Sequence, residues 1–94
     1  MTAVEIRDTL IRDIQEIQQL SGRPDQEITD ATVPLRDLFD FDSLNAEEVT
    51  VRVATVLKIE LEHHLRLFTD GQQPISIRQI VHRLCEHTES KGSE

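Results

Sequence analysis

The chain is organised around Asp40-Phe41-Asp42-Ser43-Leu44, which stands at the head of the run NAEEVTVRVATVLKIEL. A side-chain oxygen of Asp42 or Ser43 is suited to cap the first turn of a helix, and Glu47 and Glu48 follow in its first turns. Considered alone, Ser43 is most simply explained as a helix cap. The rest of the chain decides whether this serine does more.

The residues after this loop predict a helix over 43–58. Alternation of Val49, Val51 and Val53 also fits a β-strand, but the acidic cap, the alanines and the length of the segment favour a helix. Val51 lies off the apolar face and is expected to be partly exposed. The expected apolar face consists of Leu44, Val49, Val53, Val56 and Leu57.

Two further helices are predicted over 2–20 and 76–87. Thr2 and Glu5 have the spacing of a capping box, and so do Ser76 and Gln79. Gly22 and Pro24 end the first helix. The buried stripe of the first helix is Ile6, Leu10, Ile14 and Ile17, widened by Ile11 and Leu20; that of the last is Ile77, Ile80, Val81, Leu84 and Cys85.

The connections are less regular than the helices. Residues 21–41 form a long loop whose apolar side chains are expected to pack across the helices, with a helical turn around 35–39. A short third helix is predicted over 63–68, followed by a loop over 69–74. The tail 89–94 is expected to fray. We therefore predict one all-α domain over 1–94, a bundle of three to four helices with a long first loop.

Composition excludes several classes of function. The 94 residues carry a net charge of −8, which argues against nucleic acid and against an anionic membrane surface. An acidic domain suits basic protein partners, although a generally acidic soluble protein explains the charge equally well. One cysteine, no apolar run long enough to span a membrane and no signal pattern predict a cytoplasmic protein without membrane insertion.

Metal and thiol chemistry have weak support. His82, Cys85 and Glu86 have ligand-like helical spacing, whereas the adjacent His63 and His64 would point apart. Cys85 continues the apolar stripe, so burial is the simpler explanation. A small metal-dependent or thiol enzyme that uses His82 and Cys85 remains an alternative, but we expect no metal site.

Self-contained catalysis is also poorly supported. Ser43 has no histidine nearby in the sequence and no glycine-flanked nucleophile elbow, and the three glycines are isolated. What remains is a serine at a helix start on an acidic surface. That arrangement suits a residue that another enzyme modifies, so we expect a protein without enzymatic activity of its own.

The chain resembles an acyl carrier protein of the phosphopantetheine-binding family. Asp42-Ser43-Leu44 is similar to the family's DSL attachment motif, and Phe39 stands where the family usually has leucine. The segment 57–61, LKIEL, looks like the family's FGIEL, which closes the second helix at the same distance from the serine. Residues 75–81 are similar to the start of its last helix, and the resemblance covers about 4–87.

The resemblance implies that Ser43 carries 4′-phosphopantetheine, transferred from coenzyme A by a phosphopantetheinyl transferase, and that Asp42 assists this modification. The terminal thiol would hold acyl intermediates as thioesters for fatty-acid, polyketide or related biosynthesis. Leu44, Glu47 and Glu48 would contact acyl-ligase or synthase-type partners through basic docking patches on those enzymes. A monomer is expected.

Departures from the family pattern point to a specialised, freestanding carrier. Asp40 replaces the glycine that commonly precedes the motif, and aspartate tolerates left-handed backbone better than most residues. Arg52 and Ala54 weaken the usual acidic face of the second helix. Two alternatives remain: a carrier-like helical interaction module that is never modified, and a peptidyl or aminoacyl carrier.

Overall fold

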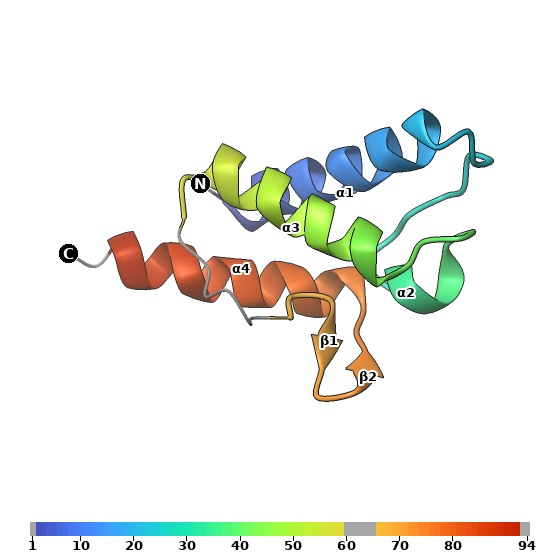
Figure 1. The fold of residues 1–94 in the computed structure, drawn as a ribbon. Coiled ribbons are helices and arrows are strands. Elements are labelled where there is room, and N and C mark those ends of the chain that lie inside the picture. Colours follow the sequence, from blue (N-terminus) through green and yellow to red (C-terminus); the bar gives the residue numbers. More distant parts are fainter. Residues whose placement is uncertain (1, 60–65, 93–94) are drawn as a thin grey trace.

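The structure, a computed structural model, describes residues 2–59 and 66–92, with side chains through His87 (Figure 1). Four helices make up most of this part of the chain, so the prediction of a small helical fold is confirmed. The first helix, α1, packs against both α3 and α4. In Figure 1, α1 runs from left to right, while α3 and α4 run back from right to left.

Helix α1 spans Ala3–Leu20 and begins at the predicted capping box. The backbone N–H and the hydroxyl of Thr2 donate hydrogen bonds to Glu5, which lowers the pKa of that carboxyl. The predicted stripe is confirmed from Ile6 to Ile17. The prediction that Leu20 widens this buried stripe is wrong. Leu20 lies in the last turn of α1, where the chain leaves the bundle, and is 76% exposed.

The long first connection is hydrogen-bonded to the start of α4. It contains α2, a single helical turn over Pro34–Asp37, which is slightly earlier than the predicted turn. The carbonyls of Asp30 and Thr32 accept hydrogen bonds from the backbone N–H groups of Arg78 and Ile77. This loop therefore satisfies amides at the start of α4 that no helical carbonyl reaches.

Helix α3 spans Ser43–Leu57, which confirms the helix and excludes the strand. It ends at Lys58, whose φ of 57° is left-handed. Val49 and Val53 are fully buried and Val51 is 66% exposed, as expected. The predicted apolar face is wrong at two positions. Leu44 is 72% exposed because it lies on the side of α3 opposite the buried Val53, and Val56 is 44% exposed near the end of the helix.

Residues 69–74, predicted as a loop, form a small antiparallel hairpin. Strand β1, Thr69–Asp70, pairs with β2, Gln73–Pro74, around Gly71 with φ of 63°. Arg83 on α4 donates hydrogen bonds to the carbonyls of Arg66 and Thr69, which fixes the hairpin to that helix.

The predicted third helix is wrong where the structure describes it. Residues 66–68 form a turn, in which Leu67 and Phe68 are buried. These two apolar side chains are buried from a turn, and the sequence pattern does not distinguish that arrangement from burial on one face of a helix. The first part of that prediction, residues 63–65, lies outside the described residues.

Helix α4 spans Ile77–Gly92 and begins at the predicted box of Ser76 and Gln79. Ile75 and Ile80 flank this start and are both buried, as a hydrophobic staple requires. The predicted end of this helix at 87 is wrong, because the helix continues to Gly92. Fraying of the tail stays a prediction, and residues 93–94 lie outside the described part. Adding residues to an existing helix is far easier than starting one, and most residues of this polar segment have adequate helix propensity.

Candidate functional site

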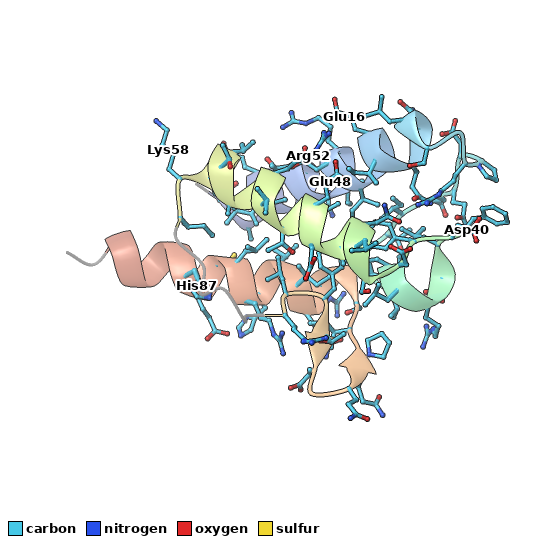
Figure 2. The ribbon with its side chains drawn as sticks, in the orientation of Figure 1. Glu16, Asp40, Glu48, Arg52, Lys58 and His87 are labelled. Carbon is cyan, nitrogen blue, oxygen red and sulfur yellow. The ribbon has the colours of Figure 1, made fainter. Side chains whose placement is uncertain are left out.

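The loop that leads to Ser43 alternates between solvent and core. Phe39 is 52% exposed, while Phe41 is buried with its ring centroid 5.7 Å from that of Phe68. Between them, Asp40 has φ of 53°, the left-handed conformation that its place in the loop suggested. Figure 2 shows Asp40 at the far end of the molecule from Lys58. The reversal at Asp40 and the anchor at Phe41 together set the direction in which the chain enters α3.

Asp42, not Ser43, caps α3. Asp42 Oδ1 accepts a hydrogen bond from the backbone N–H of Asn45 at 3.0 Å, and Asn45 Oδ1 accepts one from the Asp42 N–H at 3.3 Å. Ser43 is the first residue of the helix and is exposed, and its hydroxyl makes no hydrogen bond within the described residues. The capping function is therefore fulfilled without Ser43, whose hydroxyl remains accessible.

Side chains from distant parts of the chain hold the backbone of Phe39. Its N–H donates to Gln26 Oε1 at 2.6 Å, and its carbonyl accepts from Gln18 Nε2 at 2.8 Å. Gln26 also donates to the carbonyl of Asp37 at 3.1 Å. Gln18 is only 6% exposed although it is a polar residue of α1.

Arg23 links the same glutamine to the cap of α3. Its Nη1 lies 2.9 Å from Gln18 Oε1 and 2.8 Å from Asn45 Oδ1. Neither Arg23 nor Asn45 was singled out from the sequence. The spacing of Asp42 and Asn45 is that of a capping box, and this signal could have identified Asn45. Nothing in the local pattern indicates the contact of Arg23 with a helix that starts twenty residues later.

The docking residues predicted on α3 lie on its exposed surface. Leu44, Glu47 and Glu48 are all exposed. Arg52 Nη2 is 3.8 Å from Glu48 Oε1, and Arg52 Nη1 is 3.3 Å from Glu16 Oε2 on α1. Figure 2 shows these three side chains together where α1 and α3 meet. Arg52 thus offsets part of the negative charge on this face, and Glu47 has no such partner among the described residues.

Among the residues that the structure describes, the other candidate chemistry does not assemble into a site. His82 Nε2 is 3.1 Å from Glu86 Oε1 on the surface of α4, and Cys85 is half-buried. Within residues 2–59 and 66–92, no three histidine, cysteine, aspartate or glutamate side chains are grouped as metal ligands. His63 and His64 lie outside the described residues.

Comparisons with known proteins bring no relative. Protein-family models, curated proteins and solved structures were searched, and none of them matches this chain. No described helix combines the length and the apolar character needed to cross a membrane.

Proposed function

We propose that this protein is an acyl carrier protein whose Ser43 bears 4′-phosphopantetheine. The single observation that carries the proposal is the Ser43 hydroxyl, which is exposed at the first residue of α3 and makes no hydrogen bond within the described chain. A serine that capped the helix would have its oxygen engaged by backbone amides. Here Asp42 has that role, so the hydroxyl fits covalent attachment.

The backbone on both sides of the serine supports the proposal. The family that the sequence resembles commonly has glycine at the positions of Asp40 and Lys58. Both residues have left-handed backbone here, with φ of 53° and 57°. Non-glycine residues seldom adopt this conformation, and single positions do so where the fold requires it. The chain therefore keeps the backbone shape of glycine at both places despite the different side chains.

The modification is a phosphoryl transfer from coenzyme A. Ser43 Oγ attacks the phosphorus atom nearer the pantetheine, and a new P–O bond forms to the serine. The P–O bond to adenosine 3′,5′-bisphosphate breaks, and a base of the transferase takes the hydroxyl proton. Asp42 lies beside the reacting residue and would assist the transferase. The attached group supplies a terminal thiol that holds acyl groups as thioesters.

We propose that partner enzymes dock on the exposed face of α3. Leu44 supplies an apolar contact next to Ser43, and Glu47 and Glu48 supply negative charge. A basic patch on an acyl ligase or synthase would complement that charge and hasten association. Because Arg52 is paired with Glu48, Glu47 should contribute more to this attraction than Glu48 does.

The proposal is tested by intact mass. The unmodified protein is incubated with coenzyme A and a broad-specificity phosphopantetheinyl transferase, and the mass should rise by one phosphopantetheine group. Ser43→Ala should abolish the increase, while Ser21→Ala, which changes another exposed serine, should leave it intact. Absence of the adduct, or an adduct on the Ser43→Ala protein, would refute the proposal. The first result would favour a helical interaction module that is never modified.

A further inference from the structure

One chain of side-chain hydrogen bonds joins the end of α1 to the start of α3. A single nitrogen, Arg23 Nη1, donates to Gln18 Oε1 and to Asn45 Oδ1, at 2.9 and 2.8 Å. Asn45 belongs to the capping box that also contains Asp42. The guanidinium therefore sets the spacing between α1 and the first turn of the helix that presents Ser43.

The backbone at the end of α1 fixes where Arg23 starts. Gly22 has φ of 72°, its N–H donates to the carbonyl of Gln19, and the N–H of Arg23 donates to the carbonyl of Gln18. These are the two hydrogen bonds of a Schellman motif. Arg23 is half-buried and is attached to a defined helix end, so its side chain loses less freedom when it bridges to α3.

The loop before Ser43 depends on side chains for its conformation. Both polar groups of the Phe39 backbone are satisfied by glutamine side chains, those of Gln18 and Gln26. The next residue, Asp40, has the left-handed backbone that surrounding structure must maintain. Loss of these hydrogen bonds would free the segment in which the chain turns toward the helix.

We propose that Gln18, Arg23 and Gln26 are positioning residues for Ser43. They hold residues 39–42 in the conformation that a phosphopantetheinyl transferase recognises. This inference rests on the proposed function. None of the three side chains contacts the Ser43 hydroxyl within the described residues, so they act through the loop and the α3 cap. Without them the competent conformation becomes a smaller fraction of the folded protein.

A smaller competent fraction has a kinetic signature. The apparent affinity of the transferase falls in proportion to that fraction, whereas the chemical step, once the complex forms, is unchanged. For Arg23→Ala we expect KM for the carrier to rise about tenfold or more, with kcat within about twofold of the parent value. KM for Arg23→Lys should lie between those of the parent and Arg23→Ala, because the shorter lysine side chain can reach Gln18 Oε1 or Asn45 Oδ1 more easily than both. Gln26→Ala, at an exposed position, should resemble Arg23→Ala.

The experiment measures kcat and KM of the transfer for the parent and these variants, below the unfolding temperature of each. Arg12→Ala, which removes an exposed arginine of α1, is the matched control and should leave both constants unchanged. Amide hydrogen exchange of the unmodified proteins gives a second readout. Arg23→Ala should speed exchange at residues 39–45 and leave Ile80 in α4 protected.

The outcomes separate the two proposals. If the parent protein accepts no phosphopantetheine, the proposed function fails, and positioning for a transferase fails with it. If the parent is modified and both Arg23→Ala and Gln26→Ala keep its KM and its exchange pattern, only the positioning inference is overturned. A fall in kcat at constant KM would also overturn it, because that result assigns Arg23 to the chemical step.

Discussion

Replacement of Asp13 by asparagine should stabilise the protein at neutral pH. Asp13 lies on α1, is only 4% exposed, and its Oδ2 is buried without a hydrogen-bond partner within the described residues. Burial raises the pKa of this carboxyl and the charge of Glu16 adds to the shift, while Arg12 and Arg52 oppose it. The positive charges therefore compensate the buried charge only in part.

The size of the effect follows from the polar atoms left without partners. A buried polar group that lacks a hydrogen bond costs about 1–3 kcal/mol, and more when it is charged. Asp13→Asn keeps the side-chain volume and removes the charge, but its amide still has unpaired groups. We therefore expect the free energy of unfolding at neutral pH to rise by roughly 1 kcal/mol.

The pH dependence of the gain follows from the raised pKa. The folded protein binds the proton of Asp13 more tightly than the unfolded chain, whose carboxyl has the ordinary value of 3.8. The parent protein thus loses stability as pH rises through the folded pKa and regains it as pH falls. The advantage of Asp13→Asn should be full at neutral pH and should disappear below 3.8.

Urea unfolding followed by circular dichroism at both pH values measures this difference. Asp8→Asn, at an exposed acid of the same helix, is the control and should change stability by less than about 0.5 kcal/mol. A less stable Asp13→Asn protein at neutral pH would overturn this prediction. It would mean that the positive charges of Arg12 and Arg52 stabilise the Asp13 carboxylate by more than its burial costs.

Three further predictions concern the stability of the fold. Ile80→Ala empties a fully buried position of α4 and should lower the free energy of unfolding, measured in urea, by about 2–5 kcal/mol. Val51→Ala on the exposed face of α3 should lower it by less than about 0.5 kcal/mol. A loss below about 0.5 kcal/mol for Ile80→Ala would show that this side of α4 does not face the core. Asp40→Val should cost about 1–2 kcal/mol because a β-branched residue resists left-handed backbone, and Asp40→Gly should not destabilise; equal effects of the two would contradict the strained turn. Thr2→Ala removes the cap of α1 and should lower the free energy of unfolding by about 1 kcal/mol, which thermal unfolding shows as a lower midpoint. An unchanged midpoint would show that the cap does not stabilise the protein.

The helices were predictable because their signals are local. The boxes at Thr2 and Ser76 lie next to apolar stripes of helical period, and each starts a helix where the pattern places it. The hairpin at 69–74 was missed because its four strand residues are mostly polar and too few to show alternation. Leu44 was wrongly assigned to the core, because with 3.6 residues per turn it lies about half a turn around α3 from the buried Val53, on the same side as the exposed Val51.

The candidate site was predictable in part. Ser43 and its neighbours were identified from the motif, but the choice of Asp42 over Ser43 as the cap needed three-dimensional structure, because both side chains carry a suitable oxygen. Gln18 and Arg23 could not be found in this way. Their partners, Phe39 and Asn45, are more than twenty residues away, and no local pattern records a contact over that distance.

We propose that Ser43 carries a thioester-forming group in the cell. The most direct measurement is the intact mass of the protein from its native host, before and after treatment with hydroxylamine, followed by peptide mapping. We predict one phosphopantetheine group on the peptide that contains Ser43, together with a further mass that hydroxylamine removes. A native protein with the mass of its unmodified sequence would contradict the proposed modification of Ser43.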